Sequence, residues 1–166
     1  KEKEQLRKVL KIAVWTTTPW TLPANAAVGI NSKLNYVFAK NQEKDEVLIV
    51  ASELLAEVSE RIEVNLIPLA DIKGELLKGI LYKNPLFDRI SPVVIGGNYI
   101  TTQSGTGLVH TAPGHGIDDF KTGLENDLDV ICPVDERGIF TCEAGKFQGL
   151  NVLKDANSVI IDELKK

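Results

Sequence analysis

The chain has 166 residues, enough for a domain with its own hydrophobic core, and 43% of them are apolar and 25% charged. Its net charge of −4 argues against a stand-alone nucleic-acid binder, because neutralising phosphates requires clustered Lys and Arg. No apolar run is long enough to span a membrane, and residues 1–11 form a mixed-charge lead-in rather than a targeting peptide. Cys132 and Cys142 lack a CxxC partner and are expected to be free thiols, so we expect a cytoplasmic protein.

The elements expected along the chain are mostly short strands. They are predicted at residues 10–17, 26–30, 36–40, 47–51, 66–69, 79–82, 93–95, 99–101, 108–111 and 130–134. Helices are expected after Ser52 as a cap, from about 117 to 126, and after Asp155 as a cap. This pattern predicts a β-rich α+β fold class, with a barrel-like β core of short strands and peripheral helices.

No linker or internal repeat divides the chain, so a single domain over residues 1–166 is expected. The chain contains no methionine, which indicates a piece excised from a longer protein.

Residues 15–25 form the most informative segment, with the sequence W-T-T-T-P-W-T-L-P-A-N. Three consecutive threonines in a strand place hydroxyls on both of its faces. Pro19 then ends strand pairing, because proline has no N–H to donate. We call residues 15–25 the threonine corner and expect a rigid strand-to-loop bend that lines a ligand site.

A second unusual segment, residues 105–120, holds both histidines of the chain in the sequence G-T-G-L-V-H-T-A-P-G-H-G-I-D-D-F. An apolar strand runs into a Gly/Pro turn and then into a helix whose first turn carries Asp118 and Asp119. Three interpretations stay open for this segment: a metal site, a purely structural role, and a ligand site in which Asp119 holds an amine. A phosphate site is disfavoured, because no lysine follows the glycines and the carboxylates would repel an anion.

The two segments together resemble the editing domain inserted into class I aminoacyl-tRNA synthetases of the isoleucine, valine and leucine group. The threonine corner specifically resembles the isoleucyl members, because the valyl and leucyl members typically carry an arginine and an acidic residue where this chain has Thr18 and Trp20. The H-I-G-H and K-M-S-K-S motifs of the synthetase core are absent, which fits an excised insertion.

The resemblance implies that the domain hydrolyses valine wrongly attached to tRNA(Ile), which is editing after transfer of the amino acid to the tRNA. Whether it also edits before that transfer stays open. It implies that Asp119 holds the substrate's α-amino group and that His110 lines the side-chain pocket and rejects isoleucine. Thr18 and Thr21 are the candidates for positioning the attacking water. The remaining implied contacts to the adenosine end and the carbonyl come from Thr16, Thr17, Trp20 and Asn25. Threonine is too weak a base to deprotonate water, so we expect catalysis by positioning.

The expected partners are the 3′ aminoacyl-adenosine end of tRNA(Ile) and the rest of the parent synthetase, with no membrane. No metal or other cofactor is expected in this domain, whereas the parent would use ATP and Mg for aminoacylation. The alternatives are a valyl- or leucyl-type editing domain, a metal-dependent hydrolase using His110, His115, Asp118 and Asp119, and a module that only docks a tRNA end.

Overall fold

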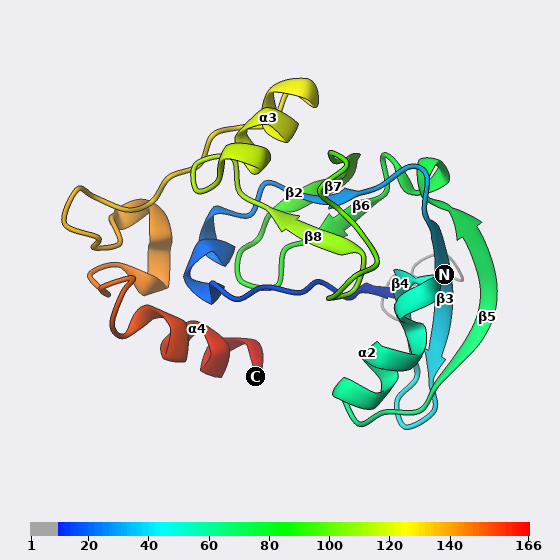
Figure 1. Ribbon diagram of the computed structural model, residues 1–166. Helices are drawn as coiled ribbons and strands as arrows, with labels where there is room; N and C mark the ends of the chain where they lie inside the picture. Colours follow the sequence, from blue (N-terminus) through cyan, green and yellow to red (C-terminus); the bar gives the residue numbers. More distant parts are fainter. Residues whose placement is uncertain (1–9) are drawn as a thin grey trace. The chain divides into compact units, whose positions relative to one another are not determined.

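The computed structural model describes residues 10–166, which divide into two compact units (Figure 1). The charged lead-in predicted from the sequence lies almost entirely outside the described residues. The first unit comprises, among the described residues, 10–15 together with Gly29–Lys78 and Val94–Val109. The second unit comprises Thr16–Val28, Gly79–Val93 and His110–Lys166.

The first unit is built around a four-stranded sheet with the strand order β1-β4-β3-β5. The strands are β1 (Leu10–Ile12), β3 (Asn35–Asn41), β4 (Glu46–Ala51) and β5 (Leu66–Lys73). Strand β3 pairs antiparallel with β4 in the register Tyr36 to Ala51 and Asn41 to Glu46, so the two strands form a hairpin. A 3-10 turn (Ser52–Leu54) and helix α2 (Leu55–Arg61) follow β4.

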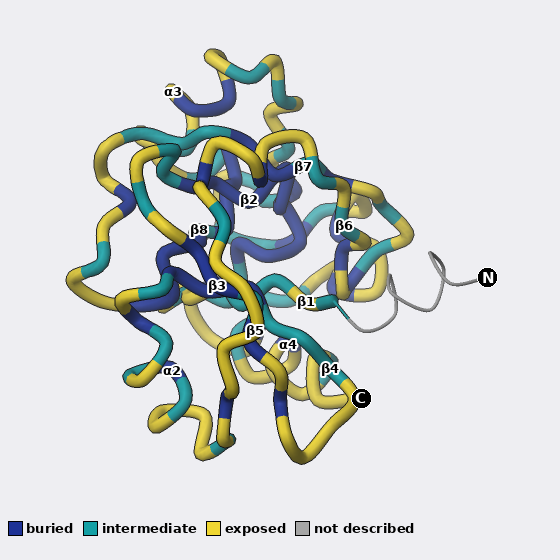
Figure 2. Tube along the Cα trace, turned by 90° about the vertical axis from the view of Figure 1, so that its right-hand side faces the viewer, coloured by how far each residue is buried: buried dark blue, intermediate teal, exposed yellow. Residues whose placement is uncertain are grey.

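The second sheet has the order β6-β7-β2-β8. Its strands are β6 (Leu81–Lys83), β7 (Ile90–Ile95), β2 (Ala27–Ile30) and β8 (Leu108–Thr111). All four residues of β2 are buried, as are three of the four in β8 (Figure 2). The continuously apolar sequence of β2 is typical of a strand covered on both faces.

Helical segments complete the structure: 3-10 helices η1 (Pro19–Ala24), η3 (Gly74–Leu77) and η4 (Cys142–Phe147), and α-helices α3 (Ile117–Glu125) and α4 (Ala156–Leu164). A buried apolar cluster in the second unit joins η1, η4 and α4. Its members are Leu22, Leu86, Phe140, Ala144, Phe147, Val152, Ala156 and Ile160. The threonine corner is therefore fixed to the same core as the C-terminal helix.

The expected β-rich α+β fold class is confirmed, with the described strands arranged as two four-stranded sheets. Helix α3 and strand β8 fall where the sequence predicts them. Cys132 and Cys142 are free, as expected, and both are exposed. No helix within residues 10–166 is long and apolar enough to cross a membrane. The prediction of a single excised domain over residues 1–166 stays a prediction.

Several local predictions are wrong. The first strand ends at Ile12 rather than at residue 17, and residues 99–101 form no strand. Residues 130–134 contribute only an isolated bridge between Val134 and Phe140. Ser52 does not cap a helix, because its hydroxyl donates to Asp71 Oδ1 instead.

Candidate functional site

The threonine corner has an exposed half and a buried half. The Thr16 hydroxyl accepts a hydrogen bond from the Thr18 N–H at 3.1 Å, so the chain turns locally instead of pairing as a strand. Thr17 and Thr18 are exposed, whereas every residue from Thr21 to Asn25 is buried. Pro19 begins η1 at a position where its missing N–H costs no helical hydrogen bond.

The buried half of the threonine corner binds His110, at the end of β8, through both nitrogens of its ring. The Nε2 atom lies 2.9 Å from the Thr21 hydroxyl, and the Nδ1 atom lies 2.8 Å from the Asn25 side-chain nitrogen. The same Thr21 hydroxyl donates to the Thr18 carbonyl at 2.9 Å. The three side chains are each at least nine-tenths buried, so these bonds form away from water.

Asn25 is itself held by residues that the sequence did not single out. Its carbonyl oxygen accepts from the Tyr82 hydroxyl and from the Asn84 amide, and its side-chain nitrogen also donates to Ala27 O at 2.8 Å. Arg89 donates to the Asn25 backbone carbonyl at 2.7 Å. A buried asparagine needs partners for its oxygen and its nitrogen, but nothing in the sequence indicates which residues supply them.

His110 is electrically neutral at ordinary pH. The pKa of its imidazole is lowered from 6.5 to about 4, mainly by burial and also by the nearby His115, while the hydrogen bond with Thr21 opposes the shift. Within residues 10–166, no group of three or more His, Cys, Asp and Glu side chains is placed to hold a metal ion.

Asp119 lies in the first turn of α3 and is half-buried. Its Oδ2 atom accepts a hydrogen bond from the Ala112 N–H at 3.0 Å. Burial raises the pKa of this carboxyl; the Ala112 bond opposes that rise and the charge of Asp118 adds to it. The neighbouring Asp118 is exposed, with Lys121 at 3.7 Å, so the two adjacent carboxylates have different surroundings.

Trp20 and His115 form an edge-to-face pair, with 5.1 Å between ring centroids. Trp20 also packs against the apolar cluster of the second unit, and its backbone N–H donates to Asn157 Oδ1 at 2.9 Å. These contacts fix Trp20 against the core of the second unit, and its expected contact with the adenosine end stays a prediction. Trp15 belongs to the first unit, where the Arg61 guanidinium lies 4.5 Å from the centre of its ring.

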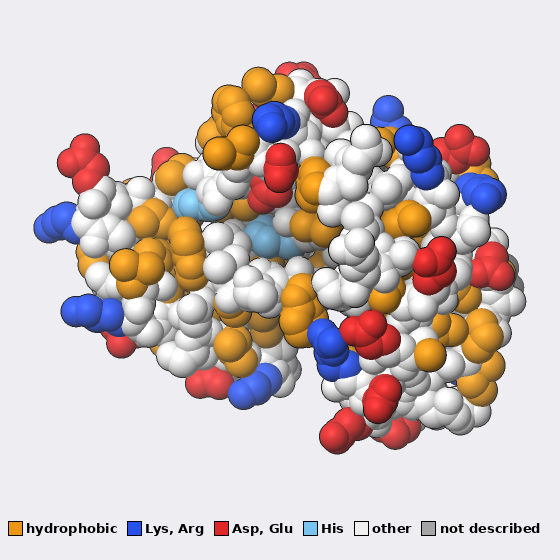
Figure 3. Space-filling view, viewed as in Figure 1, with side chains coloured by type: hydrophobic (Ala, Val, Ile, Leu, Met, Phe, Trp, Pro, Cys, Tyr) orange, Lys and Arg blue, Asp and Glu red, His pale blue; other side chains and the backbone are white. Residues whose placement is uncertain are grey.

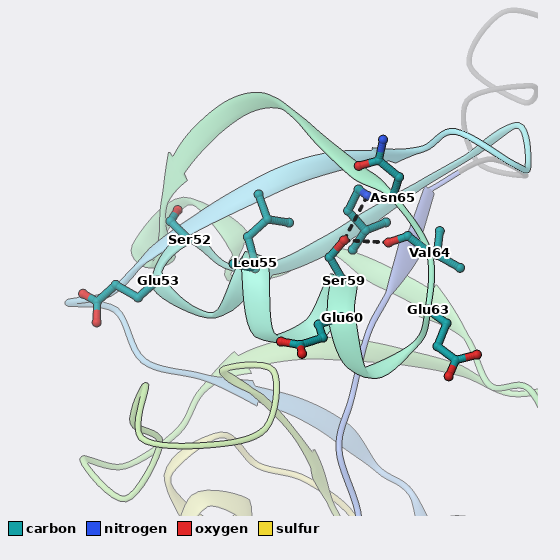
Figure 4. Close-up of a pocket in the computed structure, with 10 residues that line it drawn as sticks. Ser52, Glu53, Leu55, Ser59, Glu60, Glu63, Val64 and Asn65 are labelled. Carbon is teal, nitrogen blue, oxygen red and sulfur yellow. Dashed lines mark hydrogen bonds between the residues drawn. The ribbon is translucent and has the colours of Figure 1, made fainter.

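All the predicted site residues lie in the second unit, and hydrogen bonds join four of them: Thr18, Thr21, Asn25 and His110. Both histidines, in pale blue, are visible on one face of the molecule with acidic side chains beside them (Figure 3). A separate groove, in the first unit, contains none of the predicted residues. It lies along α2 and the start of β5, where the Ser59 hydroxyl donates to Val64 O, and it is rich in glutamate (Figure 4).

Comparison with known proteins connects these segments to one family. No family model matches the chain. It is 67% identical over 161 residues to the isoleucine–tRNA ligase of Prochlorococcus marinus strain MIT 9211, covering 97% of this chain and 17% of that protein. It is 56% identical over 165 residues to the same ligase of Parasynechococcus marenigrum strain WH8102, covering 99% of this chain and 17% of that protein. The chain belongs to the isoleucine–tRNA ligase family.

Solved structures resemble this ligase segment in fold. The crystal structure of GlLeuRS-CP1 superposes with a TM-score of 0.74 at 21% identity, over 99% of this chain and 86% of that one. The Plasmodium knowlesi cytosolic leucyl-tRNA synthetase editing domain gives 0.59 at 15% identity, over 76% of this chain and 57% of that one. The ligase segment therefore has the fold of a class I synthetase editing domain, and the resemblance to isoleucyl members is confirmed.

Proposed function

We propose that the chain hydrolyses valine from mischarged tRNA(Ile) within the parent isoleucine–tRNA ligase. The observation that carries the proposal is the half-buried Asp119 carboxylate, fixed by Ala112 in the same unit as the neutral, hydrogen-bonded His110. A carboxylate in such surroundings suits a cationic α-amino group, because a charge-assisted hydrogen bond is strong where water is partly excluded. The sequence identity with isoleucine–tRNA ligases and the editing-domain fold support the same conclusion.

Such a second site is needed because valine is isoleucine less one methylene. For isoleucine and valine, which are the standard example of this problem, the hydrophobic pocket that selects the amino acid for aminoacylation gains only about 1–3 kcal/mol of binding free energy from the extra methylene. Higher accuracy requires a second site that admits valine, excludes isoleucine and hydrolyses the ester. We assign the exclusion of isoleucine to the wall that contains His110.

In the proposed reaction, water attacks the ester carbonyl carbon, the bond from that carbon to the ribose oxygen breaks, and a proton goes to the ribose oxygen. Asp119 holds the ammonium group while the exposed Thr18 hydroxyl positions the water. The buried Thr21 hydroxyl already bonds Thr18 O and His110, so it contributes by orienting these groups. With no strong base among these side chains, rate enhancement comes from positioning and carbonyl polarisation.

The rest of the ligase completes this proposal. The chain spans about 17% of the length of its relatives. The remaining part of the parent protein is therefore available to bind the tRNA body. We propose that only the 3′ aminoacyl-adenosine end enters this segment, and that ATP and Mg serve aminoacylation elsewhere in the parent.

The decisive experiment is the Asp119→Ala substitution in the full-length ligase, with deacylation of Val-tRNA(Ile) as the readout. Loss of a charged hydrogen bond is expected to slow deacylation by about tenfold to a hundredfold. Asp118→Ala is the matched control, because it removes the adjacent, exposed carboxylate from the same helical turn. Equal effects of the two substitutions, or none from Asp119→Ala, would contradict the proposal.

A further inference from the structure

The hydrogen bonds around His110 run in one direction from Tyr82 to Thr18. The Tyr82 hydroxyl donates to Asn25 Oδ1, the Asn25 side-chain nitrogen lies against His110 Nδ1, and His110 Nε2 lies against the Thr21 hydroxyl. The Thr21 hydroxyl donates to the Thr18 carbonyl. All of these groups belong to the second unit.

The protonation state of His110 follows from the two ends of this chain of bonds. The single hydrogen of the Thr21 hydroxyl is used on Thr18 O, which can only accept, so His110 Nε2 must carry a hydrogen and donate it. The Asn25 side-chain nitrogen can only donate, so His110 Nδ1 must be unprotonated and accept. Both requirements select the neutral tautomer with hydrogen on Nε2.

The orientation of the Asn25 amide decides the second requirement. If the amide were reversed, its oxygen would face Ala27 O, and two acceptors would meet at 2.8 Å. The Tyr82 hydroxyl strengthens the observed orientation by donating to the amide oxygen, with Asn84 adding a longer bond of 3.4 Å. Burial raises the pKa of Tyr82 to about 12, so the hydroxyl keeps its proton at ordinary pH.

We propose that Tyr82 is a positioning residue that, through Asn25, holds the His110 imidazole as the neutral Nε2–H tautomer against Thr21. A ring held in this way uses both nitrogens inside the protein and presents no charge that would repel a cationic amine. Protonating His110 would place an N–H opposite the Asn25 N–H, so it requires the network to break. His110 then acts as a rigid wall rather than as a general base.

Nuclear magnetic resonance tests this directly, because the chain has only two histidines. In the chain labelled with ¹⁵N-histidine, His110 is assigned by comparison with a His115→Gln variant. We expect the neutral Nε2–H signature from neutral pH down to about pH 5. An Nδ1–H signature, or a mixture of tautomers at neutral pH, would overturn the proposal.

Two substitutions test the role of Tyr82. Tyr82→Phe should introduce a mixture of tautomers. Tyr36→Phe is the control and should not, although it also removes a buried hydroxyl, which donates to Gly107 O in the first unit. Asn25→Asp replaces the donor facing Nδ1 by an acceptor, so it should protonate Nδ1 and raise the pKa of His110. An unchanged His110 spectrum in Tyr82→Phe would refute the positioning role of Tyr82, and an unchanged spectrum in Asn25→Asp would show that Asn25 does not select the tautomer.

The effect of Tyr82→Phe on hydrolysis rests on the proposed function, whereas the NMR test of the His110 tautomer is independent of it. In the full-length ligase, Tyr82→Phe should slow Val-tRNA(Ile) deacylation by about two- to tenfold, with Tyr36→Phe close to the unaltered enzyme. If the unaltered enzyme fails to deacylate Val-tRNA(Ile), the proposed function fails while the tautomer result stands. If deacylation is normal in Tyr82→Phe, the positioning role in hydrolysis fails.

Discussion

At the residue scale, His110 couples the stability of the chain to pH. Its pKa is lowered from 6.5 to about 4, so the unfolded chain binds more protons than the folded chain between these values. The contribution of the neutral imidazole is therefore complete above about pH 6.5 and is lost as the pH falls toward about 4. The difference in pKa corresponds to about 3 kcal/mol of unfolding free energy.

Urea unfolding of the chain and of a His110→Gln variant measures this contribution. We expect the gap between their unfolding free energies to narrow by about 3 kcal/mol from pH 7 to pH 4, since the variant lacks the titrating ring. His115 is less buried and should contribute a smaller slope in the same direction. A gap that stays constant with pH would show that His110 titrates normally in the folded chain.

The residues with a chemical motif could be found from the sequence, and their supporting residues could not. His110 and Asp119 stand in a Gly/Pro-rich segment that marks them as unusual. Tyr82 and Asn84 stand in a weakly patterned strand and turn, and their importance arises only because folding brings them to Asn25. The hydrogen bond from Tyr82 to Asn25 joins residues that are 57 positions apart, and the one from Asn25 to His110 joins residues that are 85 positions apart. Contacts at such separations leave no periodic signal in a single sequence.

At the element scale, the joint between η1 and α4 holds the threonine corner in place. Asn157, in the first turn of α4, accepts the Trp20 backbone N–H. Asn157→Ala leaves that N–H without this partner and should cost about 1 kcal/mol. Amide hydrogen exchange at Trp20 should accelerate, whereas Ser158→Ala, at an exposed neighbour bonded to Asp155 O, should leave it unchanged. Equal exchange in the two variants would show that another element fixes the corner.

Gly114 permits the loop before α3 to approach the backbone of residue 131 closely. A β-carbon at Gly114 would lie 2.4 Å from Ile131 O, so Gly114→Ala must displace backbone. We expect a loss of about 1–3 kcal/mol in unfolding free energy, measured by urea denaturation. Gly116→Ala is the control, because its backbone is extended and its β-carbon would meet Asp119 at an ordinary 3.4 Å. A smaller loss in Gly114→Ala than in Gly116→Ala would contradict this explanation.

The same elements show why some boundaries escaped prediction. The threonine-rich residues 16–18 have strand propensity, but the Thr16 hydroxyl binds the Thr18 N–H and competes with sheet pairing. Apolar residues 130–134 look like a strand, yet they pair only at Val134. Strand β8 and helix α3 were predictable because a buried apolar run and a Gly/Pro turn mark their ends.

At the scale of the whole molecule, the acidic composition predicts a division of labour with the rest of the ligase. A chain of net charge −4 lacks the cation excess that holds a tRNA body by its phosphates. In the proposed function only the aminoacylated end enters this site, so we expect most of the binding free energy for tRNA to come from elsewhere in the parent. The isolated chain should therefore hydrolyse Val-tRNA(Ile) far more slowly than the full-length ligase.

A small substrate separates weak tRNA binding from a defective site. Valyl-adenosine ester carries the chemistry of the tRNA end without the phosphates of the body, so the isolated chain and the ligase should hydrolyse it at similar rates. The kcat/KM for Val-tRNA(Ile) should instead be lower in the isolated chain by at least about a hundredfold, because binding energy from contacts remote from the reacting bond also contributes to kcat/KM. Asp119→Ala should impair both substrates in both proteins. If the isolated chain matched the ligase on Val-tRNA(Ile), the tRNA body would contribute nothing and this division of labour would be wrong.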